Sequence, residues 1–143
     1  MNSPILGPVV ALVAWTLVMM LWMMVTRFAA MKEKGISLKG RVGTRTGALE
    51  GVVDDRVNWK AHNYMHLVEQ PTLFYAIAIA LALMGGGGGF DLILAWAYVG
   101  LRVLHSLIQA ITNVVLHRFV VFLLSSVALI ALTAHAAIHL LHH

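Results

Sequence analysis

The sequence predicts an all-α integral membrane protein, a four-helix bundle. Hydrophobic residues make up 60% of the 143 residues, charged residues only 11%, and the mean hydropathy is +0.85. A soluble domain carries roughly a quarter charged residues. Four apolar stretches are each about 20 residues long, which is the length that a helix needs to cross a bilayer. Little chain remains outside them, so we expect residues 1–143 to form a single domain of four transmembrane helices.

The first expected helix covers about residues 5–28. No basic segment precedes its apolar run and no small-residue cleavage site is evident, so we expect a membrane anchor rather than a cleaved signal. A polar segment with closely spaced glycines follows at about residues 31–60, and we expect it to be a loop.

Helices are expected next at about residues 62–84, 90–112 and 118–141. The run Gly85–Gly89 predicts a turn between the second and the third. Pro71 interrupts the second helix, because its missing N–H releases a backbone carbonyl and favours a kink.

The basic residues predict the orientation of the bundle. None lies in the N-terminus, between the second and third helices, or in the C-terminus. The positive-inside rule therefore places the loop at 31–60 in the cytoplasm and both termini outside. Topology and anionic lipid headgroups account for the net charge of +4, so nucleic acid is not an expected partner. Apart from Arg102, every basic residue flanks a helix on the cytoplasmic side: Arg27, Lys32, Lys34, Lys39, Arg41, Arg45, Arg56, Lys60 and Arg118.

Polar residues inside the apolar helices indicate a functional site. At about 100° per residue, those of the third helix fall on one face: Arg102, His105, Ser106, Gln109, Thr112 and Asn113. The second helix begins with a similar polar arc: His62, Asn63, His66, Glu69 and Gln70. Ionisable groups are costly in a bilayer, so they must face the bundle interior or a polar cavity. Both sets reach similar depths in the cytoplasmic half, where Arg27 and Arg118 also lie, so we expect one shared site.

Structural roles and metal binding are alternatives for the same residues. Arg102 could pair with Glu69 to neutralise a buried charge, and Asn63 and Gln70 could form interhelical hydrogen bonds. His62, His66 and Glu69 stand at i, i+4 and i+7, a spacing that could hold Zn²⁺ or another transition metal. The chain has no cysteine, so any thiol chemistry must come from a substrate or cofactor.

At these residues the chain resembles the MAPEG family, the membrane-associated proteins in eicosanoid and glutathione metabolism. The family's second-helix pattern R-A-H-x-N-x-x-E-x-x-x-P-x-x-F is similar to the segment from Lys60 to Phe74. Its third-helix pattern R-x-x-H/Y matches Arg102 and His105, and a later family arginine matches Arg118. The resemblance covers essentially the whole chain. Three positions differ: Lys60 replaces the first arginine of the pattern, His66 replaces a family acid, and Gln109 replaces a frequent tyrosine.

The resemblance implies a homotrimer that binds glutathione between subunits near the cytoplasmic face, where it attacks or reduces a lipophilic electrophile or hydroperoxide. By position, Asn63 and Arg102 would bind peptide and carboxylate groups, and His105 would hydrogen-bond the tripeptide. Arg118 would be the catalytic residue, because it stabilises the reactive thiolate. Arginine suits the carboxylates of glutathione and glutamate suits its ammonium group.

The same polar layer supplies the remaining candidate glutathione contacts: His66, Glu69, Gln109 and Arg27. The resemblance is to distant bacterial members, which implies the bacterial inner membrane. A non-enzymatic member of the fold that binds a lipid or another ligand remains an alternative to the enzyme.

Overall fold

The computed structural model describes residues 3–35 and 53–142, and the regular secondary structure within them is entirely helical. The elements are α1 (Leu6–Glu33), α2 (Asp55–Leu67), α3 (Pro71–Leu83), α4 (Phe90–Leu107), the π-helical segment η1 (Ile108–Thr112) and α5 (Val115–His142). Four spans are long and apolar enough to cross a membrane, with α2 and α3 together forming one of them. The prediction of an all-α, four-helix membrane protein is confirmed.

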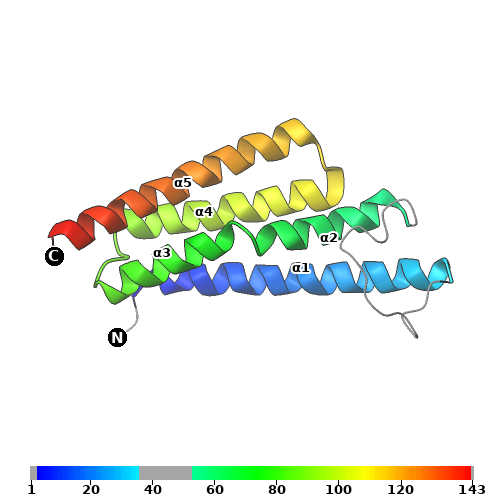
Figure 1. Cartoon of the computed structure of the whole chain (residues 1–143), viewed down its shortest axis with the longest axis horizontal. Coiled ribbons are helices and arrows are strands. Elements are labelled where there is room, and N and C mark those ends of the chain that lie inside the picture. The colour runs from blue at the N-terminus through cyan, green and yellow to red at the C-terminus, as the bar shows by residue number, and fades with distance from the viewer. Residues whose placement is uncertain (1–2, 36–52, 143) are drawn as a thin grey trace.

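The helices run side by side along the long axis of the molecule (Figure 1). Both termini lie at one end with the turn between α3 and α4, which we call the terminal end. At the other, the α2 end, α1 finishes, α2 starts and η1 leads into α5. The closest packing joins α5 to α4 and α1 to α2, and α5 also packs on α3. The greater part of the predicted loop at 31–60, residues 36–52, lies outside the described residues.

The second span begins at Asp55, about two turns before the expected start near residue 62. Asp54 caps the helix: its side chain accepts a hydrogen bond from the backbone N–H of Arg56 at 2.9 Å. Val53 is buried against Met31 near the end of α1. Hydropathy missed these turns because they are amphipathic and extend beyond the apolar run that defines the span.

Pro71 divides the second span, as predicted. α2 ends at Leu67, a turn covers Val68–Gln70, and Pro71 is the first residue of α3. Proline has no N–H to continue the ladder, but it is well suited to the first helical position. In the turn, the carbonyl of His66 accepts a hydrogen bond from the backbone N–H of Glu69 at 3.3 Å, and Arg102 also donates a hydrogen bond to it.

The core is aromatic and aliphatic in its middle and towards the terminal end. Phe74 of α3 stacks on Tyr98 of α4 with ring centroids 4.5 Å apart, and neither side chain is exposed. Leu12 and Leu132 are also completely buried in this cluster. Many large apolar side chains of α1 and α5 face outward instead, as is expected where the surroundings are lipid.

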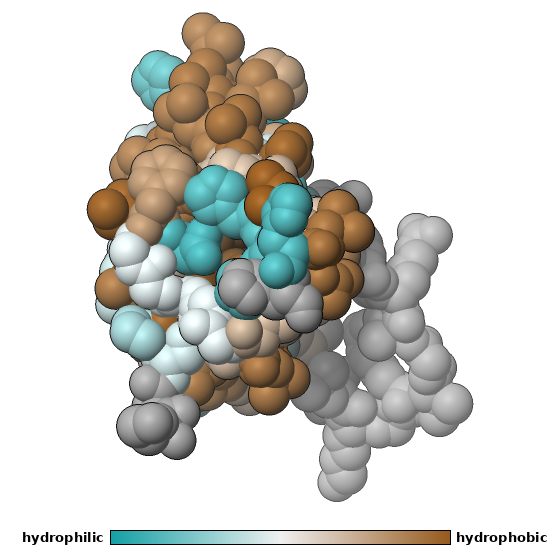
Figure 2. Space-filling view, turned by 90° about the vertical axis from the view of Figure 1, so that its left-hand side faces the viewer, coloured by the Kyte–Doolittle hydropathy of each residue, from teal (hydrophilic) through white to brown (hydrophobic). Residues whose placement is uncertain are grey.

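Polar residues gather at the centre of the terminal end, surrounded by apolar surface (Figure 2). There His135 of α5 and Asp91 of α4 lie 2.6 Å apart, joining the two helices. The α3–α4 turn fits closely over the N-terminal segment, because a Cβ on Gly87 (φ +92°) would lie 2.6 Å from Ile5. These contacts join α4, α5 and the N-terminal segment at the terminal end.

Candidate functional site

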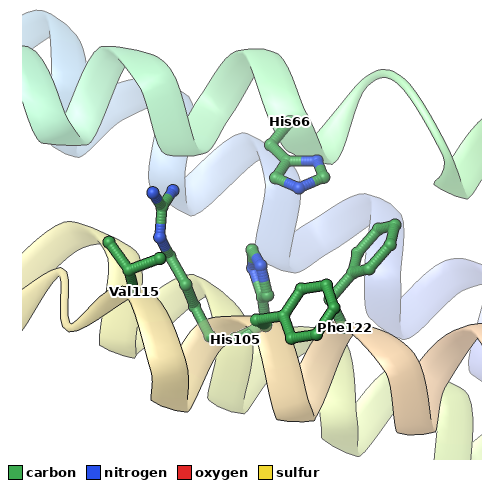
Figure 3. Close-up of a pocket in the computed structure, with 6 residues that line it drawn as sticks. His66, His105, Val115 and Phe122 are labelled. Atoms are coloured by element: carbon green, nitrogen blue, oxygen red, sulfur yellow. The ribbon is translucent and has the colours of Figure 1, made fainter.

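A pocket of about 190 Å³ lies between α2, α4 and α5, towards the α2 end. Figure 3 shows the ring of His66 projecting from α2 towards His105 and Phe122. The two histidine rings meet edge to face at 4.8 Å, and Phe122 lies 5.6 Å from His66 and 6.2 Å from His105. The pocket is lined by His66, His105, Val115, Arg118, Phe119 and Phe122.

One face of α5 forms an entire wall of this pocket. Val115, Arg118, Phe119 and Phe122 stand at i, i+3, i+4 and i+7, which places them on a single helical face. The chain turns sharply into α5 at Asn113, which adopts the left-handed conformation with φ 51°. Arg118 therefore brings a cation to the edge of an otherwise apolar and aromatic wall, as its predicted role at the site requires.

Arg102 lies behind the pocket and is fully buried, with an exposed fraction of 0%. Its Nη2 donates to the main-chain oxygen of His66 at 3.3 Å, whereas Nε and Nη1 have no hydrogen-bond partner. No salt bridge joins it to a carboxylate within residues 3–35 and 53–142. A buried cation is costly without a salt-bridge partner, so Arg102 is a candidate contact for an anionic ligand.

The ion pair considered from the sequence, Arg102 with Glu69, is not present. Glu69 lies in the turn that Pro71 imposes, and its side chain is exposed. Helical-wheel spacing placed it on the arc of Asn63 and His66, but that arc ends where α2 ends. Glu69 therefore does not line the pocket, and neither does Arg27, which is half-buried on α1.

Further buried polar atoms lie on α2, on the span of α4 and η1, and at the start of α5. The amide nitrogen of Asn63 donates to the hydroxyl of Ser106 at 2.6 Å, which ties α2 to α4. Native proteins rarely leave buried polar atoms without a partner, so such atoms are candidate ligand contacts. Those between Asn63 and Arg118 are Asn63 Oδ1, His66 Nδ1, Arg102 Nε and Nη1, Gln109 Oε1, Asn113 Oδ1 and Arg118 Nε.

The predicted polar stripe of the third helix is continuous only as far as Gln109. Arg102, His105 and Gln109 are buried, but Thr112 is exposed. The helix widens to π-helical geometry over Ile108–Thr112, so the residues of that turn no longer follow 100° spacing. A π-helical turn beside a polar cluster is itself a frequent mark of functional sites.

The metal alternative has no geometric support. Among the described residues, no group of three or more histidine, cysteine, aspartate or glutamate side chains is placed to hold a metal ion. His62, His66 and Glu69 lie within that part of the chain. The α2–α3 break moves Glu69 out of the register that the sequence spacing assumed.

Sequence reasoning missed the apolar part of the site. It identified Arg118 but not Val115, Phe119 and Phe122, because apolar residues in a membrane span are equally typical of lipid contact. The signal that could have found them is their position on the same helical face as Arg118.

The fold and these residues define a class: an integral membrane four-helix bundle with a charged candidate site between three of its helical spans. The model of the MAPEG family matches residues 5–138, and the chain belongs to that family. No curated protein and no solved structure gives a match.

Proposed function

We propose that this protein is a membrane-bound glutathione-dependent transferase or peroxidase that acts on lipophilic electrophiles or hydroperoxides. Membership of the MAPEG family supports the use of glutathione. The single observation that carries the proposal is the completely buried Arg102, whose Nε and Nη1 have no partner. A carboxylate of glutathione would supply the missing counter-charge through charge-assisted hydrogen bonds.

The neighbouring polar atoms fit the rest of the tripeptide. Asn63 Oδ1 and Gln109 Oε1 are acceptors without a partner, suited to the N–H groups of the peptide or to its ammonium group. His66 and His105 lie between this layer and the pocket, where they would contact the cysteinyl part. Glu69 is exposed, so the ammonium group would depend on these amide oxygens rather than on that carboxylate.

Arg118 is the proposed catalytic residue. Its guanidinium lines the pocket, and a cation beside a thiol favours the thiolate, which is the nucleophilic form. The thiolate sulfur would attack the electrophilic carbon and form a C–S bond while the leaving group departs with the bonding electrons. Val115, Phe119 and Phe122 would hold the lipophilic substrate, which reaches them from the bilayer.

A homotrimer in the bacterial inner membrane, with both termini outside, completes the proposal. The pocket is open on one side in a single chain, and a neighbouring subunit would close it. The predicted orientation places the α2 end at the cytoplasmic face, where glutathione is available.

The experiment is a conjugation assay on detergent-purified protein with 1-chloro-2,4-dinitrobenzene, alongside cumene hydroperoxide for the peroxidase reaction. The matched control replaces glutathione by ophthalmic acid, which has a methyl group in place of the thiol. We expect turnover with glutathione and competitive inhibition by ophthalmic acid. Binding of glutathione without turnover of any electrophile would favour the non-enzymatic alternative, and no binding would refute the proposal.

A further inference from the structure

The side chain of Gln70 connects three helical spans on the terminal-end side of the pocket. It occupies the last position before α3, and its half-buried side chain reaches α4 and α5. The hydroxyl of Tyr98 donates to Gln70 Oε1 at 3.0 Å, and Gln70 Nε2 donates to the hydroxyl of Ser126 at 2.9 Å. Because Tyr98 occupies the carbonyl side of the amide, the NH₂ side must face α5.

This hydrogen-bonded group, Tyr98–Gln70–Ser126, lies beyond the pocket walls, towards the terminal end. Ser126 follows Phe122 by four residues of α5, a rise of roughly 6 Å, and Gln70 lies beyond His66 in the turn that follows α2. His66 and Phe122 are the pocket residues that face each other from α2 and α5 (Figure 3). The side-chain bond between the second and fourth spans thus forms next to the pair of pocket residues His66 and Phe122.

Beyond this bond towards the α2 end, α5 has little support from the second span. It packs on α3 and α4 but not closely on α2, and its first turns rise away from α2 in Figure 1. The pocket occupies this region. Gln70 therefore holds α5 at the point where it starts to diverge from the second span.

We propose that Gln70 is a specificity-determining residue: its bond to Ser126 fixes the depth and width of the pocket and so limits the size of the electrophile. This inference rests on the proposed function. Gln70 does not touch the reacting atoms in this role, because it acts through the position of Phe122 and Arg118 on α5.

The first test measures the α2–α5 distance. The chain has no cysteine, so Arg56→Cys and Leu116→Cys place two spin labels, one on α2 and one on α5, without background labelling. Gln70→Leu and Ser126→Ala should both give a longer and broader distance distribution in detergent micelles. Ser126→Thr keeps the hydroxyl group, so it should give the same distance distribution as the wild type. Thr133→Val is the matched control, because the Thr133 hydroxyl bonds only within α5, to the carbonyl of Leu129.

The second test measures substrate selection in the same variants without labels. The ratio of kcat/KM for two-ring 1-chloro-2,4-dinitronaphthalene to that for one-ring 1-chloro-2,4-dinitrobenzene should rise about tenfold in Gln70→Leu and Ser126→Ala. The KM for glutathione should stay unchanged, which a general loss of folding would not allow.

An unchanged distance distribution in both variants would overturn the inference, as would a changed distance with an unchanged substrate ratio. If the wild-type protein turns over neither the two chlorides nor cumene hydroperoxide, the proposed enzymatic function fails and the specificity role falls with it. The spin-label distances then still decide whether Gln70 positions α5.

Discussion

The guanidinium of Arg102 donates to the main-chain carbonyl of His66, with 3.3 Å between Nη2 and the oxygen. This carbonyl lies at the end of α2, where it also accepts a hydrogen bond from the backbone N–H of Glu69 in the turn before Pro71. The bond satisfies only one of the three guanidinium nitrogens, since Nε and Nη1 have no partner. The kink thus helps to place a buried cation at the site and leaves most of its donors for a ligand.

Replacing Arg102 should weaken glutathione binding without lowering the stability of the unliganded protein. Arg102→Met removes a buried charge that lacks a counter-ion, so the unliganded protein should unfold at the same temperature or a higher one. At glutathione concentrations of about 100 times Kd, ligand binding should raise the free energy of unfolding of the wild type by about 2.7 kcal/mol. Arg102→Met should not show this increase. Thermal unfolding in detergent, with and without glutathione, measures both effects.

Arg102→Lys is the matched control, because it keeps the charge but loses the planar set of donors. Arg102→Lys should retain part of the increase in unfolding temperature that glutathione causes in the wild type. A strongly destabilised Arg102→Met protein that still responds fully to glutathione would show that Arg102 is purely structural.

Arg118 should act on the thiol rather than on affinity. Arg118→Ala should raise the pKa of the bound glutathione thiol and lower kcat, with a smaller change in KM. Thiolate absorbance near 240 nm against pH reports the titration. His117→Ala, at the exposed neighbouring position, is the control and should leave it unchanged. If Arg118→Ala changes neither the thiol titration nor kcat, Arg118 has no role in thiol activation and serves only membrane topology.

The hydrogen bond between Asn63 and Ser106 should be visible as a coupling energy. Ser106→Ala leaves the buried Asn63 amide without its 2.6 Å partner and should cost about 0.5–2 kcal/mol of unfolding free energy. In the double variant Asn63→Leu, Ser106→Ala, part of that loss should return, because no unpaired group remains. A double-mutant cycle in detergent measures the coupling, and strictly additive losses would contradict it.

Both termini should lie outside the cytoplasm. They share the terminal end of the bundle, opposite the end at which α1 finishes and α2 starts (Figure 1). Alkaline phosphatase is active only outside the cytoplasm, so it should be active when it is fused to the C-terminus. Green fluorescent protein becomes fluorescent only in the cytoplasm, so the same fusion with this protein should not fluoresce. The reverse pattern would overturn the positive-inside assignment.

The sequence predicted the fold, and it also indicated which polar residues of the second and third spans are buried, because both depend on strong local signals. Long apolar runs have few alternatives to membrane helices, and a buried arginine must find a polar interior. The positions of Asn63, His66, Arg102 and His105 could therefore be read from helical spacing. Gln70 was considered for interhelical hydrogen bonding, and its bonds to Tyr98 and Ser126 confirm that interpretation.

The errors arise where the backbone departs from regular α-helix. Glu69 was placed on the polar arc of α2, but Pro71 ends that helix first. Thr112 was placed on the polar stripe of α4, but the π-helical turn shifts it. The aromatic wall of α5 could not be predicted for a different reason: the same apolar residue types occur where a membrane helix faces a pocket and where it faces lipid.

Equilibrium binding of glutathione tests the central claim most directly. Isothermal titration of the detergent-purified wild type and of Arg102→Met should be compared under identical conditions, with Thr133→Val as the control. The account predicts saturable binding to the wild type and the control, and binding to Arg102→Met that is weaker by tenfold or more, equivalent to about 1.4 kcal/mol. No binding to the wild type, or equal affinity in Arg102→Met, would contradict a site built around this buried arginine.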